Sequence, residues 1–265
     1  MSGSPVGRPL GRPSGRPSGR RDMDAIVCDA VFKAGSRRVA DLAVELGVSE
    51  VTIRKSLDAL ESRGLVRRFH GEARAWDGDD IPFRMGLFYE EKRRIAELAA
   101  ALVSRGDTIL IEAGSAAAFL AERLKGEKDL TVVTPNLFIA RIFRGSKVRV
   151  VVTGGAYQEE SESLVGPVAV AAIRSLGFSK AFVGVSGWTA ETGFTLNDFA
   201  RAEITRTVLE RGAENYVLTD SSKFGRAHSS TVCSDPSILR AVVTDAGIPA
   251  AARAALEAGG AKVVT

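Results

Sequence analysis

The sequence has few of the residues from which disulfide frameworks and metal sites are built. It contains two cysteines, Cys28 and Cys233, and two histidines, His70 and His228, and both pairs are widely separated along the chain. We therefore expect no disulfide framework, no metal site and no cofactor. The sequence also lacks any run of about 18 apolar residues and any apolar secretory signal at its start. A cytoplasmic protein is expected.

The composition is that of a folded protein with an uneven distribution of charge. Hydrophobic residues make up 45% of the 265 residues, which is enough for well-packed cores in two domains. Residues 1–76 contain 14 Lys and Arg against 9 Asp and Glu, whereas the rest of the chain is close to neutral. The positive charge of the N-terminal part favours association with a polyanion through counterion release.

Part of this positive charge lies in a tail of low complexity. Residues 1–21 carry five arginines and no acidic residue, and they repeat the triplet Gly-Arg-Pro three times. A stretch so rich in Gly, Pro and Ser cannot build a core and is expected to be disordered. Two interpretations remain open. The tail is either a flexible segment attracted to any DNA, or an arm that resembles an AT-hook and enters the minor groove.

The stretch 38–74 has the layout of a helix-turn-helix followed by a basic hairpin. Apolar residues recur at helical spacing over 39–46, Gly47 breaks this helix, and Ser49 is placed to cap the next one. A helix with exposed hydroxyls and cations fits the major groove, and cations on a hairpin meet phosphates. We predict a winged helix-turn-helix domain over residues 22–76. The predicted DNA contacts are Ser49, Thr52, Arg54, Lys55, Arg67, Arg68, His70 and Arg74.

This segment resembles the N-terminal domain of the DeoR-type bacterial transcription regulators. The family pattern includes V-S-x-x-T-I-R-[RK]-x-L and a wing with H-G-G, and the chain has VSEVTIRKSL at 48–57 and HGE at 70–72. Glu72 stands where the family usually has a second wing glycine, which places a carboxylate beside the phosphates.

After a polar linker predicted at 77–88, strands and helices alternate over residues 89–265. A helix is expected near 89–105, followed by five further helical segments between apolar runs. The expected strands are 108–112, 130–134, 148–153, 180–185, 215–220 and 240–245. This alternation predicts an α/β domain with a mainly parallel, Rossmann-like sheet that is covered on both faces. Ligands of such folds bind beyond the carboxyl ends of the strands.

Polar and glycine-rich residues follow several of these strands. Gly114 and Ser115 come after the first strand at a helix start, where backbone N–H groups and a hydroxyl can meet an anion. Pro135 and Asn136, Gly154 and Gly155, and the run 221–223 follow other strands. Together these strand ends favour a small ligand that carries phosphate.

Residues 80–246 also resemble the DeoR-type sensor domain, in the blocks EAGSAAAFLA, VVTPN, VTGG, FVGVSGW, GFTLND and TDSSKFGR. The resemblance implies the fold of ribose-5-phosphate isomerase and a response to phosphorylated sugars or related metabolites. The implied effector contacts are Gly114, Ser115, Thr134, Asn136, Gly154, Gly155, Gly184, Gly187, Asn197, Asp220 and Lys223. Lysine and helix-end N–H groups suit a phosphate, and Asn and Asp suit sugar hydroxyls. For Asp220 and Lys223 an exposed surface pair is the alternative.

Four positions depart from the family's sensor pattern. Glu112 replaces an Asp, Ala116 replaces a hydroxyl residue, and Ser186 replaces a carboxylate. Pro135 displaces the asparagine of the second block. An altered ligand, weaker phosphate binding and the loss of sugar-phosphate sensing all remain open.

These features predict a DNA-binding repressor of sugar or carbon metabolism genes that a phosphorylated sugar or related metabolite releases from its operator. A palindromic operator requires at least a dimer, so a homodimer or homotetramer is expected. One alternative is a sugar-phosphate isomerase-like enzyme with a DNA-binding head, using Glu112, Asp198 or Asp220 for proton transfer. Another is a nonspecific nucleoid-type DNA binder. We expect no catalysis, and we expect no membrane partner.

Overall fold

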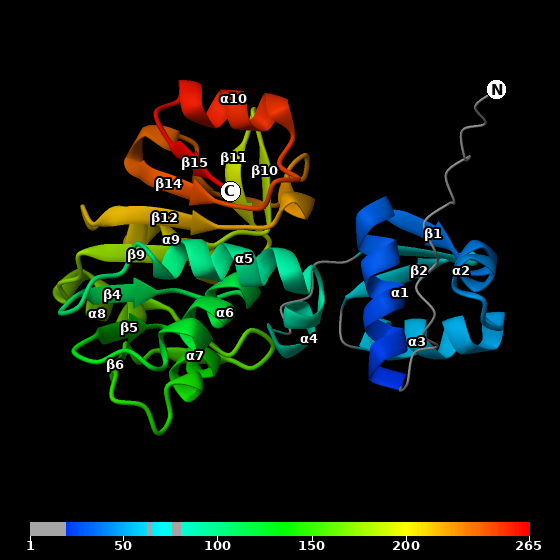
Figure 1. Cartoon of the computed structure of the whole chain (residues 1–265), viewed down its shortest axis with the longest axis horizontal. Coiled ribbons are helices and arrows are strands. Elements are labelled where there is room, and N and C mark those ends of the chain that lie inside the picture. The colour runs from blue at the N-terminus through cyan, green and yellow to red at the C-terminus, as the bar shows by residue number, and fades with distance from the viewer. Residues whose placement is uncertain (1–19, 63–64, 76–80) are drawn as a thin grey trace, which may run out of the picture.

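The computed structural model describes residues 20–62, 65–75 and 81–265. The prediction of a disordered basic tail concerns residues that lie almost wholly outside these ranges. Two parts of the chain, drawn at opposite ends of Figure 1, are joined through α4 (Ile81–Gly86) and α5 (Tyr89–Ala100).

The N-terminal part is a winged helix-turn-helix, as the sequence predicts. Its elements are α1 (Arg20–Ala34), β1 (Ser36–Arg38), α2 (Val39–Leu46), α3 (Glu50–Ser62), β2 (Val66–Phe69) and β3 (Glu72–Ala75). The three strands form an antiparallel sheet in the order β1-β3-β2. Helix α1, which the motif analysis did not identify, closes the core with Val27, Val31 and Phe32. This core needs a third helix, because α2 and α3 alone leave their apolar stripes half covered.

The stretch predicted as a polar linker contains the short helix α4. Ile81 at its start is 4% exposed and belongs to the core of the C-terminal part. Leu87, directly after α4, is 2% exposed and belongs instead to the core of the N-terminal part. The connection is therefore packed against both parts of the protein. The predicted boundaries at residues 76 and 89 stay predictions.

The C-terminal part is built on a seven-stranded sheet in which every described strand pair is parallel. The strand order is β15 (Lys262–Val264), β14 (Leu239–Val243), β12 (Glu214–Leu218), β9 (Lys180–Gly184), β4 (Thr108–Ile111), β5 (Thr131–Thr134) and β6 (Arg149–Val152). The six strands predicted from sequence are present. The three-residue β15 was not predicted, because a strand so short carries little periodicity.

Helices cover both faces of this sheet, which confirms the α/β class (Figure 1). Helices α5, α6 (Ser115–Leu124) and α7 (Leu137–Ile142) pack with one hydrophobic cluster, and α8 (Pro167–Ser175), α9 (Phe199–Leu209) and α10 (Ala250–Ala258) pack with the other. Among the described residues, no helix has the length and apolar character needed to cross a membrane.

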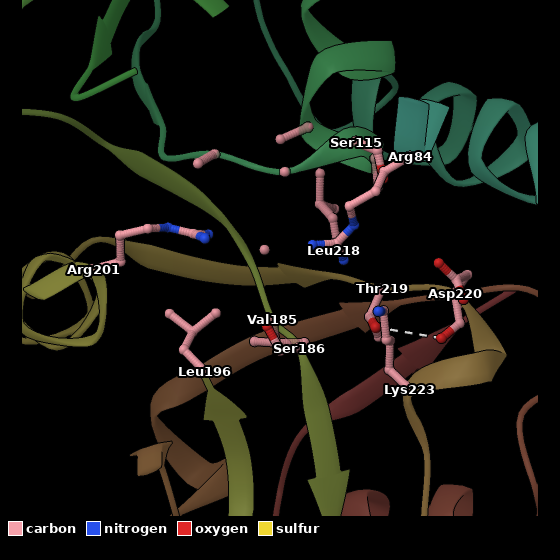
Figure 2. Close-up of a pocket in the computed structure, with 15 residues that line it drawn as sticks. Arg84, Ser115, Val185, Ser186, Leu196, Arg201, Leu218, Thr219, Asp220 and Lys223 are labelled. Carbon is pink, nitrogen blue, oxygen red and sulfur yellow. Dashed lines mark hydrogen bonds between the residues drawn. The ribbon is translucent and has the colours of Figure 1, made fainter. Parts of the chain in front are cut away.

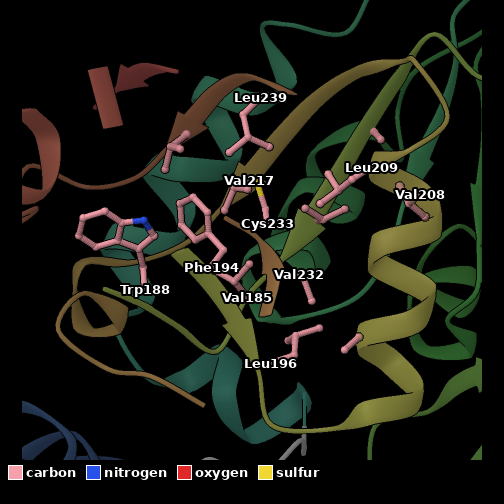
Figure 3. Close-up of a cluster of buried hydrophobic side chains, with 14 of the residues drawn as sticks. Val185, Trp188, Phe194, Leu196, Val208, Leu209, Val217, Val232, Cys233 and Leu239 are labelled. Carbon is pink, nitrogen blue, oxygen red and sulfur yellow. The ribbon is translucent and has the colours of Figure 1, made fainter. Parts of the chain in front are cut away.

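Smaller sheets that the sequence did not predict lie beside the second cluster. They consist of β7 (Ala156–Gln158) with β8 (Ser163–Val165), and of β10 (Gly187–Thr189), β11 (Gly193–Leu196) and β13 (Ser230–Cys233). Figure 3 shows Phe194 of β11 packed among residues of the main sheet. The ring of Trp188 meets that of Phe224 edge-on, with centroids 5.6 Å apart. This packing fixes the loops that follow β9 and β12.

Candidate functional site

The second helix of the helix-turn-helix is held by a local capping arrangement. Gly47 adopts a left-handed conformation with φ of 65° and ends α2. The Ser49 hydroxyl accepts a hydrogen bond of 3.2 Å from the backbone N–H of Thr52 and so caps α3. Ile53, Leu57 and other apolar residues of α3 are buried. The opposite face of the helix is left to solvent.

That open face of α3 carries part of the predicted DNA-binding set. Arg54 is 57% exposed and pairs with Glu50 at 2.7 Å on the same helix, and Lys55 is also exposed. Thr52 is half-buried, and its hydroxyl lies 3.0 Å from that of Ser49. A surface ion pair such as Arg54–Glu50 is weak, so a phosphate can take the place of the carboxylate.

The wing presents its cations unequally. Arg67 and His70 are exposed, and His70 with Gly71 forms the tight left-handed turn between β2 and β3. Arg74 lies 3.3 Å from Glu72 and 5.3 Å from the ring centre of Phe69. The Ser36 hydroxyl and the Arg74 guanidinium hold the pKa of Glu72 below its ordinary value.

Arg68 faces back toward α3. It meets Glu61 at 2.8 Å and Asp58 at 2.7 Å, and its backbone N–H donates to Glu61 at 3.0 Å. The hydrogen bond from the Arg68 side chain, and after it the one from the Arg68 backbone, lower the pKa of Glu61. Arg68 therefore fastens the wing to α3, and its charge is already matched by two carboxylates.

A small cavity lies at the carboxyl ends of the central strands (Figure 2). It is lined by Arg84, Ala113, Gly114, Ser115, Ala116, Ala117, Gly184, Val185, Ser186, Leu196, Arg201, Leu218, Thr219, Asp220 and Lys223. Five of the predicted effector residues are among them, namely Gly114, Ser115, Gly184, Asp220 and Lys223. A Cβ atom at Gly184 would lie 2.5 Å from the carbonyl oxygen of Ala113, so this position needs glycine for the two loops to approach.

Positive charge predominates around this pocket. Arg84, Arg201 and Lys223 line it from three different elements, and Figure 2 shows the ends of Arg84 and Arg201 directed into it. The start of α6 also lines the pocket, and first-turn N–H groups of a helix favour an anion. Asp220 supplies the carboxylate.

Asp220 is held in its charged form. Burial alone would raise its pKa, but Lys92, Lys223 and Arg84, together with the Ser222 hydroxyl, lower the pKa below its ordinary value. The Nζ atom of Lys92 lies 3.8 Å from an Asp220 oxygen, and Asp220 also accepts a hydrogen bond of 3.1 Å from the N–H of Ser222. Asp220 and Lys223 are both buried, so the alternative of an exposed surface pair is wrong.

Two residues predicted as effector contacts make hydrogen bonds within the local fold. The Asn136 side chain accepts from the N–H of Ile139 at 3.0 Å and donates to the carbonyl of Ser161 at 2.8 Å. It thereby caps α7. The Thr134 hydroxyl accepts from the N–H of Asn136 at 3.1 Å. The structure does not bring Thr134 or Asn136 into the pocket.

Four further predicted residues lie away from the pocket lining. Gly154 and Gly155 follow β6, and a Cβ at Gly155 would lie 2.7 Å from the carbonyl oxygen of Val165. Gly187 belongs to β10, packed against the backbone of Arg226. The Asn197 carbonyl accepts from the Ser229 hydroxyl at 3.3 Å. These residues shape the loops around the site.

The pocket cations Arg84 and Arg201 were missed by the sequence analysis. Arg201 is 5% exposed, and its backbone N–H donates to the capping Asp198 at 2.7 Å. A buried Arg on the inner face of a helix is a usable signal, since such a residue normally has a charged partner or ligand. Arg84 offers no such signal, because it lies in the short helix that was interpreted as linker.

The carboxylates expected for an isomerase-like reaction do not lie together in the pocket. Of Glu112, Asp198 and Asp220, Asp220 alone lines the pocket, whereas Asp198 caps α9 and Glu112 is buried beside β4. Within the described ranges, no cluster of His, Cys, Asp and Glu could hold a metal ion.

Comparisons with known proteins match both parts of the chain. The family model described as the DeoR-like helix-turn-helix domain matches residues 24–78, and the model described as the DeoR C terminal sensor domain matches residues 87–246.

Similar curated proteins include repressors of sugar systems. The lactose phosphotransferase system repressor of Staphylococcus epidermidis is 32% identical over 81% of this chain and 88% of its own length. That of Lactococcus lactis is 33% identical over 72% of this chain and 78% of its own. A putative aga operon transcriptional repressor of Escherichia coli O157:H7 is 28% identical over 87% and 88%.

Among solved structures, ribose 5-phosphate isomerase A of Methanocaldococcus jannaschii aligns with a TM-score of 0.38 and 19% identity. The alignment covers 51% of this chain and 54% of that protein.

Proposed function

The chain belongs to the DeoR family of transcription regulators, and we propose that a phosphorylated metabolite releases it from its operator. Repressors of a lactose system and of an aga operon are among its relatives. We infer that this chain likewise represses genes of sugar or carbon metabolism.

The observation that carries the proposed effector class is the charge of the pocket. Arg84, Arg201 and Lys223 and the first turn of α6 surround a space that contains the carboxylate of Asp220. Charge-assisted hydrogen bonds from guanidinium and ammonium groups are the strongest contacts available to a phosphate. Asp220 can accept hydrogen bonds from sugar hydroxyls. A phosphorylated sugar combines both requirements.

We assign operator contacts to the exposed residues of α3 and the wing. Thr52, Arg54 and Lys55 are placed to reach base edges or phosphates from one face of α3. Arg67, His70 and Arg74 are placed to meet the phosphate backbone. Because one recognition helix reads one half-site, the protein acts on a palindromic operator as a homodimer or larger assembly.

The test is a binding titration of the full-length protein against DNA from upstream of its own gene, at fixed salt. It is repeated with a panel of sugar phosphates. The proposal expects a preference for the operator over bulk DNA of about 4 kcal/mol or more, relieved by one compound. Binding without sequence preference would instead support a nonspecific nucleoid-type binder. Selective binding that no compound alters would contradict the effector part.

We further propose that the protein is not an enzyme. Proton transfer in an isomerase needs a base beside the substrate carbon and a partner acid, whereas of Glu112, Asp198 and Asp220 the pocket lining includes Asp220 alone. No turnover of ribose 5-phosphate above a heat-killed control is expected. Turnover that Asp220→Asn abolishes would contradict this proposal.

A further inference from the structure

The pocket is narrow in the described arrangement. Its volume is about 20 Å³, whereas a single water molecule needs about 10–15 Å³ and small-molecule pockets measure about 300–1,000 Å³. A sugar phosphate therefore enters only if lining groups move.

Arg84 differs from the other cations of the pocket in the element that carries it. Lys223 and Arg201 belong to segments within the C-terminal part, whereas Arg84 belongs to α4, which precedes Leu87 and Phe88. Its side chain is half-buried, and its charge acts on Asp220 across the pocket. An anion in the pocket would compete with Asp220 for this charge.

The backbone carbonyl of Arg84 joins the pocket to the DNA-binding domain. This oxygen accepts a hydrogen bond of 2.6 Å from Nζ of Lys92 and one of 3.2 Å from the N–H of Leu87. Lys92 lies 3.8 Å from Asp220, and Leu87 is buried in the core of the helix-turn-helix domain. One oxygen atom thus connects a pocket charge pair with the other domain's core.

Phe88, the next residue, has the backbone geometry of a strained hinge. Its φ and ψ are 50° and 45°, a left-handed conformation that is unfavourable for a bulky side chain. The ring packs against the helix-turn-helix core and lies 5.9 Å from Nζ of Lys92. A movement of Lys92 or of α4 therefore changes the contacts of Phe88 directly.

We propose that Arg84 binds the anionic group of the effector, and that its movement with Lys92 shifts Leu87 and Phe88 and thereby the DNA-binding domain. This inference rests on the proposed function. A phosphate gives both cations charge-assisted partners in place of Asp220 and the Arg84 carbonyl. Because the narrow pocket has too little room for a sugar phosphate, the ligand favours a widened arrangement and shifts the population toward it.

Binding of inorganic phosphate to the full-length protein, measured by calorimetry, tests the first half. Arg84→Ala should weaken it about tenfold or more, and Arg84→Lys should recover part of the loss. The matched control is Arg94→Ala on α5, because Arg94 is 60% exposed and pairs with Glu97 at 3.6 Å. The control should bind within about twofold of the wild type. Absence of phosphate binding in the wild type, or equal binding by Arg84→Ala, overturns the inference.

Hydrogen exchange of the backbone amides tests the coupling. Phosphate should change exchange at Leu87 and in α1 of the wild type. Phe88→Gly removes the left-handed strain and the ring contact, so it should still bind phosphate and lose this response. Phosphate binding without any exchange response in the helix-turn-helix domain of the wild type contradicts the coupling.

Neither measurement uses operator DNA. Failure of Arg84 as an anion-binding residue is therefore distinguishable from failure of the proposed repressor function, which the operator titration tests.

Discussion

The guanidinium of Arg226 donates a hydrogen bond of 2.8 Å to the carbonyl oxygen of Phe32 and lies 5.7 Å from the centre of its ring. Phe32 is part of α1 in the DNA-binding domain, and Arg226 follows the pocket residue Lys223 by three positions. The two residues border a cleft of about 650 Å³ that Phe88 also lines. Within the described ranges, contacts between the domains therefore include those at Leu87 and at Arg226.

Arg226→Ala should loosen the DNA-binding domain without disturbing the α/β domain. Loss of one hydrogen bond and one cation–π contact costs about 1–2 kcal/mol. Differential scanning calorimetry should show the helix-turn-helix unfolding at lower temperature. The control is Arg206→Ala, which removes a bond of 2.9 Å from Arg206 to the carbonyl of Thr231 within the α/β domain. An equal effect of both changes on the helix-turn-helix would refute a specific role for Arg226.

Lys55→Ala should weaken operator binding, because Lys55 lies exposed on the outer face of α3. A phosphate contact would show as a loss across all sequences, with the salt slope reduced by about 1. A base contact would cost about 1–3 kcal/mol on the operator alone. Fluorescence anisotropy at several salt concentrations separates the two results. Lys128→Ala, at an exposed position of the α/β domain, should leave binding unchanged. If Lys55→Ala matches this control, the recognition face is placed wrongly.

Asn136→Ala should destabilise the α/β domain and leave phosphate affinity intact. The change removes the cap of α7 and a buried bond to the Ser161 carbonyl, at a cost of about 1–3 kcal/mol. Urea unfolding measures the stability, and calorimetry measures the affinity. A variant that folds as stably as the wild type but no longer binds phosphate would support the effector role predicted from sequence.

Asp220→Asn should lower stability at neutral pH, and the deficit should shrink in acid. The pKa of Asp220 is lowered in the folded protein, so its charged form stabilises the fold above the ordinary carboxyl pKa of about 4. That contribution disappears as the pH falls through the lowered folded pKa. Removal of one member of a buried charge cluster costs about 3 kcal/mol.

Urea unfolding at pH 7 and at decreasing pH checks this prediction. Glu127→Gln, at an exposed position of the α/β domain, is the control and should show no comparable deficit at any pH. A deficit for Asp220→Asn that stays constant into acid would show that its charge is not the cause.

The sequence predicted local structure best where short-range chemistry dominates. Gly47 and Ser49 identify the turn and the cap between α2 and α3, and these signals depend on neighbours within a few residues. Helix α1 was missed, because its apolar face becomes meaningful only once the core it completes is known. The small sheet containing Trp188 was missed for the same reason, since its strands pair residues far apart in the chain.

The residues that line the pocket were the hardest to predict from the sequence. An asparagine after a strand can cap a helix or bind a ligand, and both uses need the same amide, so the sequence could not decide the role of Asn136. Arg201 and Arg84 reach the pocket from α9 and α4, which are more than 100 residues apart in the sequence. No periodicity links them.

By itself the sequence determined the family, the winged helix-turn-helix and the alternation of strands and helices, because each follows from patterns that are local or repeated along the chain. The tertiary structure decided which polar residues converge, since convergence depends on the strand order and on how the loops after β9 and β12 pack. It also decided that Leu87 and Ile81, six residues apart, belong to different cores. Each of the two is buried in one core, and the identity of an apolar residue does not say which core it joins.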